Sequence, residues 1–327
     1  MLKVLWKFLG KKPLQPEHQP PVAQQPPTEI VVEGMLPLAL TAHLNWHHDL
    51  PIPDWSAIYT WLDTAANEST KNEAYSACER AWLLHFAAAL GTDHHLYESR
   101  QAMVLSSVEP QVARATLAYM ERTLKRISGI LSGLAEIPQH GKDILIMFDG
   151  QDDYYRYISY CYPEEGEFAL SGGTHVNMGC SHFVTVKEDL SRVEPIIAHE
   201  MTHACLSRLP LPVWLNEGLA VNVEQRLTGQ RASSWTPQEL HEKHLRFWGE
   251  SEIQEFWSGA SFNRTDDGNL LSYDLARILV EHLARDWERF RQFVLAADQI
   301  DGGARAAREF LGISLGSLVA SLFEERS

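Results

Sequence analysis

The sequence "PIIAHEMTHACLSRLPLPVWLNEGLA", from Pro195 to Ala220, places polar side chains at fixed spacings within two apolar segments. His199 and His203 are four residues apart, so a helix would carry both imidazoles on one face, one turn apart. A proline-containing turn follows, and the second apolar segment carries Glu217. An unpaired carboxylate among apolar residues is costly, so we expect a cation beside it. The segment therefore predicts two antiparallel helices that hold a metal ion.

Two imidazoles and one carboxylate are the ligands of an open zinc site, in which water takes the fourth position. We expect His199, His203 and Glu217 to bind one Zn²⁺ per chain, with Glu200 beside the metal. Pro195 is expected in the first turn of the helix, where a missing N–H is tolerated. Gly218 would let the two helices approach closely. The alternative is a buried pair of histidines that is satisfied by hydrogen bonds and binds no metal.

"HEMTH" followed by "WLNEGLA" resembles the gluzincin metallopeptidases, and "WLNEG" is similar to the third-ligand segment of aminopeptidase N-type enzymes. The resemblance implies that His199, His203 and Glu217 are zinc ligands and that Glu200 is the general base. It extends from about Ala102 to Leu227, and more loosely over the C-terminal helices. Thirteen residues separate His203 from Glu217, as in the compact peptidase MA-like proteins. No GAMEN segment precedes the motif, so the family's means of holding a free substrate amine is missing.

The same resemblance gives roles to two further segments. "FALSGGTHV" (Phe168–Val176) occupies the place of the edge strand that pairs with the substrate backbone, and Gly172 and Gly173 would admit such a chain closely. A plain hairpin with glycine at a bulge is the alternative. "LLSYDLARILVEHL" is similar to the segment whose tyrosine faces the zinc, and Tyr273 is the matching position. Its hydroxyl would stabilise an oxyanion; alternatively, its ring packs and its hydroxyl meets solvent.

Hydrophobic periodicity predicts an α+β fold in which a small unit of strands and helices carries the HExxH helix. The gluzincin resemblance implies that this unit is a zincin-like small mixed sheet with the HExxH helix beside it. An N-terminal helical region and a C-terminal all-helical region flank it. The predicted strands are "RQAMVLSS", Asp143–Phe148, Phe168–Val176 and His182–Val186, the last two joined by a glycine-containing turn. The predicted helices are Trp55–Leu62, Asn72–Leu90, Pro110–Leu134, "YYRYISYCY", Leu270–Ala284, Trp287–Ala297 and Leu315–Glu325. The expected divisions are a disordered Pro/Gln-rich tether (1–30), the N-terminal helical region (31–95), the zincin-like catalytic unit (96–230) and the C-terminal helical region (231–327).

Composition excludes several classes of function. The chain has 327 residues, 45% of them apolar, and a formal net charge of −15, which argues against a nucleic-acid partner. No stretch approaches the ~20 apolar residues that span a bilayer. A weak membrane-surface contact by residues 1–10 is a minor alternative. The four cysteines lack CxxC spacing and are expected to be free thiols, and we expect a cytoplasmic protein.

Other motifs are weaker. His43 and His47 repeat the four-residue spacing without a third ligand, and His241 and His244 belong to a charged stretch that is expected to be solvated. "GISLG" follows a helix instead of a strand, so Ser314 is expected to cap a helix and not to be a nucleophile.

Together these features predict a zinc metallopeptidase that hydrolyses peptide bonds in a peptide or protein substrate, with Glu200 as general base. The alternative function is a non-catalytic, zinc-stabilised binding scaffold with a metallopeptidase-like fold. A scaffold needs only the three ligands, and the presence of a non-ligand base favours the enzyme.

Overall fold

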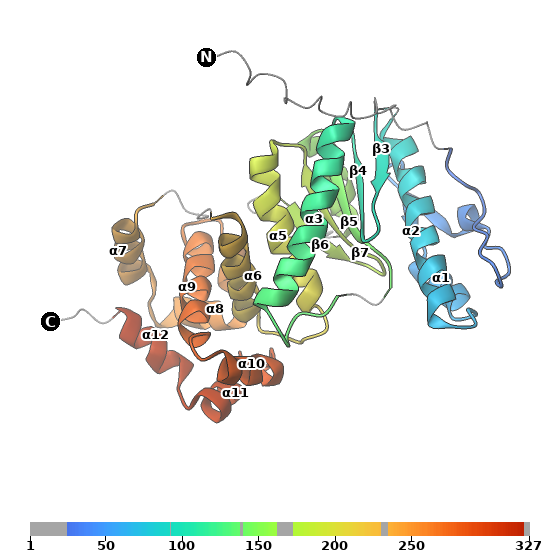
Figure 1. Ribbon diagram of the computed structural model, residues 1–327. Helices are drawn as coiled ribbons and strands as arrows, with labels where there is room; N and C mark the ends of the chain where they lie inside the picture. Colours follow the sequence, from blue (N-terminus) through green and yellow to red (C-terminus); the bar gives the residue numbers. More distant parts are fainter. Residues whose placement is uncertain (1–24, 92, 138–139, 162–172, 230–234, 324–327) are drawn as a thin grey trace, which may run out of the picture.

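The computed structural model describes residues 25–91, 93–137, 140–161, 173–229 and 235–323, and it has a mixed α+β fold (Figure 1). Its centre is a five-stranded sheet in the order β3-β4-β5-β7-β6. Strands β4, β5 and β7 are parallel, whereas β3 and β6 run antiparallel at the two edges. The strands are β3 (His95–Glu98), β4 (Ala102–Ser106), β5 (Asp143–Phe148), β6 (Gly173–Asn177) and β7 (Ser181–Val186).

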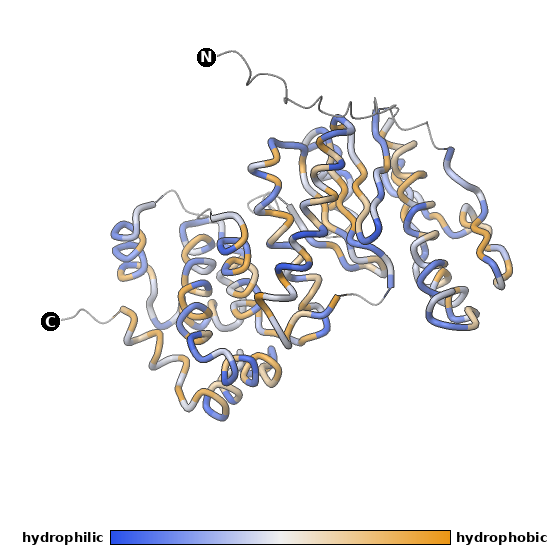
Figure 2. The backbone as a smooth tube through the Cα atoms, in the orientation of Figure 1, coloured by the Kyte–Doolittle hydropathy of each residue, from blue (hydrophilic) through white to orange (hydrophobic). Residues whose placement is uncertain are grey.

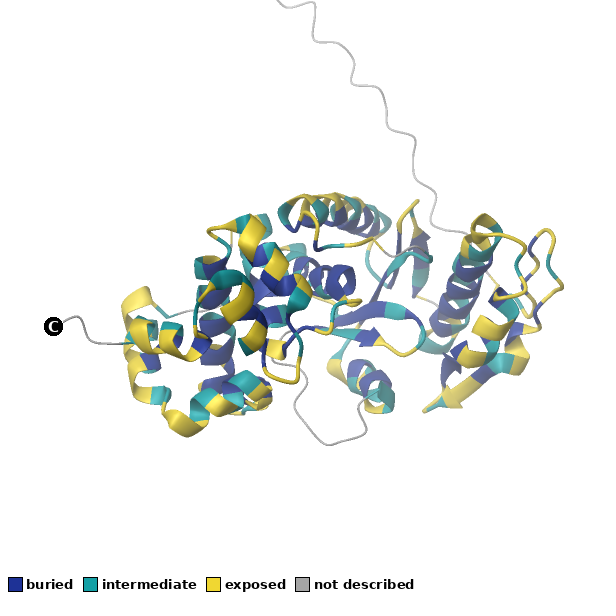
Figure 3. Cartoon of the chain, turned by 90° about the horizontal axis from the view of Figure 1, so that it is seen from below, coloured by how far each residue is buried: buried dark blue, intermediate teal, exposed yellow. Residues whose placement is uncertain are grey.

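The central strand β5 is apolar on both faces because helices cover the sheet on both sides. Leu145 and Met147 face one apolar core, and Ile144 and Ile146 face the other. This alternation follows from the two-residue period of a strand. Figures 2 and 3 show apolar, buried residues concentrated in the strands and in the helices beside them.

The first core joins the sheet to α3 (Pro110–Ile130) and α5 (Leu190–Leu206). The second core joins the other face to the N-terminal elements and α4 (Gln151–Cys161). Those N-terminal elements are a 3₁₀ turn (Leu40–His43), β1 (Leu44–His47), β2 (Leu50–Pro53), α1 (Trp55–Leu62) and α2 (Glu68–Leu90). Because α2 shares a core with the sheet, the N-terminal region packs as part of the central unit.

The C-terminal helices extend the first core away from the sheet (Figure 1). Trp214 on α6 lies fully buried among them and donates its indole N–H to the Gly302 carbonyl over 2.9 Å. These elements are α6 (Val213–Thr228), α7 (Pro237–Phe247), α8 (Glu250–Ser258), a 3₁₀ turn (Ala260–Asn263), α9 (Gly268–Leu283), α10 (Trp287–Ala296), α11 (Ala304–Ala306), a π turn (Ala307–Leu311) and α12 (Leu315–Phe323).

Gly218 allows a close helix contact, but with a different helix from the one predicted. A Cβ at Gly218 would lie 2.6 Å from the Ala276 carbonyl oxygen of α9, a distance that real side chains do not adopt. The glycine therefore fits α6 against α9, and not α6 against α5. The consequence for the site is that α9 lies close behind the helix that carries Glu217.

Several predicted elements are confirmed and some are corrected. The helix Trp55–Leu62 and the strand Asp143–Phe148 match their predicted bounds. Strands β6 and β7 form a hairpin, with Gly179 in its turn at φ +89°, but residues 168–172 of the predicted first strand lie outside the described residues. The N-terminal region is not helical throughout, because β1 and β2 form a hairpin. That hairpin turns on His48 and Asp49, which adopt φ of 47° and 62°. The prediction missed it because no glycine marks the turn.

The motif helix begins earlier than predicted. Helix α5 starts at Leu190, so Pro195 lies inside the helix and not in its first turn. Since proline has no N–H, the second turn of α5 has one donor fewer than a regular helix. The helix nevertheless continues through both histidines to Leu206.

In the part of the chain that the structure describes, no single helix is long and apolar enough to cross a membrane. The segments Ala304–Leu311 and Leu315–Phe323 reach that length and apolar content only when they are taken together, and they are bent by 87° relative to each other. Residues 1–10 and most of the predicted tether lie outside the described residues. Ile30, at the end of that tether, is buried and paired with Leu38.

Candidate metal centre

Helices α5 and α6 bring the three predicted ligands together. The Nε2 atom of His199 lies 3.2 Å from Oε2 of Glu217, and the Nε2 atom of His203 lies 3.5 Å from the same oxygen. The ligand atoms of all three residues lie within 4.8 Å of one another. Among the described residues, this is the one group of His, Cys, Asp and Glu side chains whose geometry suits a metal ion.

These separations fit a tetrahedral zinc ion. Zinc bonds to histidine nitrogen and carboxylate oxygen are about 2.0–2.2 Å long, which places neighbouring ligands of a tetrahedron roughly 3.3–3.5 Å apart. The two nitrogen–oxygen distances at Glu217 match that edge length. The donor set of two imidazoles and one carboxylate is also one that zinc accepts. The residues present therefore fit the predicted metal.

The turn between the helices determines the position of Glu217. Helix α5 ends at Leu206, and α6 begins at Val213 directly after Pro212, so the chain reverses direction within a few residues. Val213–Thr228 then packs along α5. Glu217 lies in the second turn of α6 and faces the two histidines, and the next residue, Gly218, packs against α9.

Glu224 completes the environment of His199 and was not predicted from the sequence. Its Oε2 lies 3.1 Å from Nδ1 of His199, whereas Glu217 contacts the other ring nitrogen, Nε2. Ligating histidines commonly donate their second N–H to a carboxylate, which fixes the tautomer and ring orientation. The sequence did carry a signal: Glu224 follows Glu217 by seven residues, which returns to the same helix face after two turns.

The buried charges of the cluster favour a cation. Burial alone would lower the pKa of His199, but its hydrogen bonds with Glu217 and Glu224 raise this pKa well above its ordinary value. Burial would raise the pKa of Glu217, yet His203 and His199 lower it strongly. The cluster thus attracts positive charge, which either protons or a metal can supply. The buried Nδ1 of His203 makes no hydrogen bond to any described residue.

Glu200 lies beside the ligands without joining them. Its side chain is 5% exposed, and it accepts a hydrogen bond from the backbone N–H of His175 on β6. Burial raises the pKa of Glu200, although the neighbouring histidines and the His175 N–H oppose this rise. A carboxyl group with a raised pKa, next to residues that could hold a metal ion, is suited to accept and return a proton.

The edge strand β6 passes directly beside the motif helix. His175 on this strand was not predicted as a site residue. Burial, together with the nearby His203, lowers the pKa of the His175 imidazole to about 3. The His175 ring is held by a 2.7 Å hydrogen bond between Nε2 and Oγ of Ser181. A Cβ at Gly173 would lie 2.5 Å from Cγ2 of Ile196, so this glycine is needed for the contact between β6 and α5. Gly172 lies outside the described residues.

Tyr273 lies next to the candidate ligands, as predicted. Its ring centroid is 6.4 Å from that of His199 and 5.1 Å from that of Phe262, which it meets edge to face. Burial and the nearby Glu217 and Glu200 carboxylates raise the pKa of Tyr273, so its hydroxyl keeps its proton. Among the described residues, that hydroxyl has no hydrogen-bond partner.

The weaker motifs do not form further metal sites. His43 ends a 3₁₀ turn and His47 ends β1, so they do not share a helix face. The prediction that His244 is solvated is wrong: it is buried, with Nε2 3.0 Å from Asp274 and Nδ1 accepting the Trp248 indole N–H. Ser314 precedes α12 and caps it, as predicted. All four cysteines are free thiols.

No model of a protein family matches the chain, and no curated protein is significantly similar to it.

The contact between Glu224 and His199 leads to a test. Replacing Glu224 by Gln removes the charge that orients the His199 ring, so zinc affinity should fall about 10- to 100-fold while the fold persists. Competition with a chromophoric chelator measures the change. The exposed Glu242→Gln variant of α7 is the control for loss of a carboxylate. Equal zinc affinity of Glu224→Gln and wild type would show that this contact does not support a metal ligand.

Proposed function

We propose that the chain is a zinc-dependent metallopeptidase of the gluzincin type that hydrolyses peptide bonds. One observation carries the proposal: His199, His203 and Glu217 converge at zinc-ligand spacing, and Glu200 is buried beside them without being a ligand. A purely structural zinc site is usually closed by four protein ligands, whereas three ligands leave a position for a reactant. His199, His203 and Glu217 would hold the ion.

Zinc bound at this position would acidify water and polarise the carbonyl of a scissile peptide bond. Glu200 would accept a proton from the attacking water and pass it to the leaving amine. Two features of the chain suit Glu200 to both steps. Burial raises its pKa, and the backbone N–H of His175 on β6 lies beside its carboxyl group. Glu224, through His199, would hold the first ligand in the correct orientation.

The sheet supports a peptide as substrate. Strand β6 is one of the two antiparallel edge strands of the five-stranded sheet, and it passes next to Glu200. An extended peptide can add to such an edge through backbone hydrogen bonds. An antiparallel edge strand beside the motif helix is also the zincin-like arrangement that the gluzincin resemblance implies. We therefore propose that the substrate lies along β6, with its scissile bond near Glu200.

A zinc-stabilised binding scaffold is the alternative. It would need the three ligands but not Glu200, whose burial as a carboxylate is unfavourable without a function. Among the described residues, we find no feature that a binding scaffold would need and a peptidase would not. The two proposals differ in what they predict for variants of Glu200 and Tyr273.

Glu200→Gln keeps the size and polarity of the side chain but removes the base. Hydrolysis should therefore fall by about a hundredfold or more, whereas zinc content and melting temperature stay near wild type. The assay is digestion of a broad peptide library, with products identified by mass spectrometry, and exposed Glu188→Gln serves as the control. If zinc-loaded wild type and Glu200→Gln cleave equally, the mechanism is wrong. If folded, zinc-loaded wild type cleaves no peptide, the scaffold is favoured.

Tyr273→Phe removes only a hydroxyl. If this hydroxyl stabilises the oxyanion, kcat should fall by roughly 10²–10³ with little change in KM, because the contact forms mainly in the transition state. Steady-state kinetics on a peptide found in the library measures both constants. Tyr155→Phe on α4, remote from the cluster, controls for loss of a hydroxyl. An unchanged kcat would assign Tyr273 to packing alone.

A further inference from the structure

Three polar residues meet at the end of the sheet where its parallel strands stop. Ser107 follows β4, Asp149 follows β5 and Lys187 follows β7. Beyond them the chain leads from β4 to α3 and from β7 to α5 on one face of the sheet, but from β5 to α4 on the other face. Open α/β sheets commonly bind ligands where neighbouring connections leave for opposite faces. Asp149 lies at that place.

The carboxylate of Asp149 is held through one of its two oxygens. Oδ1 accepts a hydrogen bond from Nζ of Lys187 over 2.6 Å and another from the hydroxyl of Ser107. Lys187 also donates to Oγ of Ser107 over 2.8 Å. Burial opposes ionisation, but the hydrogen bonds from Lys187 and Ser107 lower the pKa of Asp149. Among the described residues, Oδ2 has no hydrogen-bond donor, and the side chain is 44% exposed, so an ion from solvent can reach it.

A buried histidine points at this second oxygen. His94, just before β3, has a side chain that is only 4% exposed, and its Nε2 lies 3.8 Å from Oδ2 of Asp149. Nε2 is enclosed and has no hydrogen-bond partner among the described residues. Burial lowers the pKa of His94, although Asp149 and Asp153 oppose this change. The ring is therefore neutral at pH 7, and one of its nitrogens carries a lone pair.

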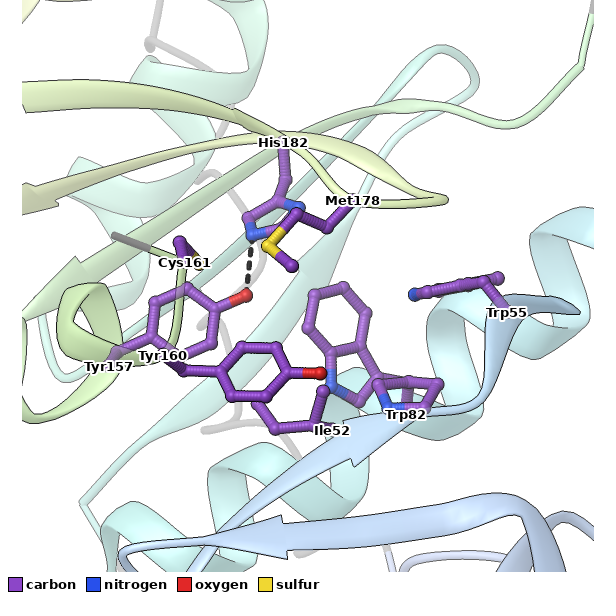
Figure 4. Close-up of a pocket in the computed structure, with 9 residues that line it drawn as sticks. Ile52, Trp55, Trp82, Tyr157, Tyr160, Cys161, Met178 and His182 are labelled. Atoms are coloured by element: carbon purple, nitrogen blue, oxygen red, sulfur yellow. Dashed lines mark hydrogen bonds between the residues drawn. The ribbon is translucent and has the colours of Figure 1, made fainter. Parts of the chain in front are cut away.

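Two other buried histidines use both of their ring nitrogens. In Figure 4, Nε2 of His182 lies 2.7 Å from the hydroxyl of Tyr157, and Nδ1 lies 2.9 Å from the Cys180 carbonyl. The rings of that pocket pack on one another and leave no room for a ligand. His244 is likewise bonded through both nitrogens. An enclosed nitrogen without a partner is unfavourable, and whatever satisfies Nε2 of His94 must fit beside Asp149.

The distance between Nε2 and Oδ2 selects among the possible partners. A direct hydrogen bond needs about 2.7–3.2 Å, so the 3.8 Å contact is not one. A water molecule bonded to both atoms would hold them roughly 4.5 Å apart. A zinc ion with bonds of about 2.0–2.2 Å holds two tetrahedral ligands roughly 3.3–3.5 Å apart, and wider angles bring this to about 4 Å. The observed separation therefore suits a shared metal ion.

The chemistry and the charge of the surroundings agree with a cation. Imidazole nitrogen and carboxylate oxygen are both zinc ligands, and hydrogen bonds usually orient a ligating carboxylate, as Lys187 and Ser107 orient Asp149. The segments 107–109, 149–150 and 187–189 carry four carboxylates and one ammonium group, which disfavours an anion. Asp153 and Asp93 also favour positive charge at His94.

We propose that His94 and Asp149 bind a second divalent metal ion, of the zinc class, at this end of the sheet. Nε2 of His94 and Oδ2 of Asp149 would be its protein ligands, and water would complete the coordination. Two protein ligands hold an ion more weakly than three, so this site would fill only after the metal centre. The ion would tie the start of β3 to the end of β5. The proposal does not depend on peptidase activity.

Titration of protein that is ¹⁵N-labelled at histidine tests this proposal, with Zn²⁺ as the probe. The ring resonances of His94, assigned by their loss in His94→Gln, should shift when Zn²⁺ exceeds one equivalent. Asp149→Asn should weaken this response at least ~10-fold, because it replaces a charged ligand. Asp152→Asn removes an exposed carboxylate from the same end of the sheet and should respond like wild type. His94 resonances that stay unchanged up to millimolar Zn²⁺ would overturn the proposal.

The paired variants separate a defined site from general attraction by the acidic surface. Equal weakening by Asp149→Asn and Asp152→Asn would show that the carboxylates act only through their field, which would also overturn the proposal. Thermal unfolding gives a second readout. Zn²⁺ beyond one equivalent should raise the melting temperature of wild type and Asp152→Asn but not that of Asp149→Asn. Because the resonances belong to His94, the result is independent of whether His199, His203 and Glu217 bind zinc.

Discussion

The contact of one carboxylate with two imidazoles determines how the centre of this protein is arranged. Glu217 reaches both His199 and His203 through a single oxygen. That contact requires α6 to reverse tightly after α5 and to lie along it. On another side of α6, Gly218 permits α9 to approach closely. Glu217 contacts both imidazoles, and a second buried carboxylate, that of Glu224, contacts His199. Burying two carboxylates at one place is favourable only if positive charge is supplied there.

The sheet places the remaining groups around this contact. Strand β6 is an edge, so its backbone can serve both Glu200 and an extended ligand, as a central strand could not. The parallel strands β4, β5 and β7 are covered on both faces, which gives α5 a rigid support. Tyr273 arrives from a third helix, α9, and its ring packs on Phe262. The candidate site therefore combines one edge strand and three helices.

Residue patterns predicted the parts of the structure that depend on local periodicity. The apolar run Asp143–Phe148 and the four-residue spacing of the histidines are examples. Glu217 was predicted from a carboxylate in an apolar helix that follows a proline-containing turn, and Tyr273 from resemblance of a short segment to gluzincins; the structure brings both to His199. Contacts between distant segments were not predictable from periodicity. His175 reaches Glu200 only because β6 lies beside α5, and His244 is buried only because α7 packs on α9. The β1–β2 turn was missed because His48 and Asp49 adopt a backbone conformation that glycine usually marks.

X-ray absorption at the zinc edge of the purified, zinc-loaded protein tests the central claim most directly. The account predicts one ion bound by nitrogen and oxygen at about 2.0–2.2 Å, with the outer-shell scattering of two imidazoles and no sulfur ligand. His203→Ala should reduce the imidazole scattering to that of one ring or abolish binding. Sulfur scattering near 2.3 Å would instead place the metal on cysteines. That result, or a spectrum unchanged by His203→Ala, would contradict the assignment of His199, His203 and Glu217 as the metal ligands.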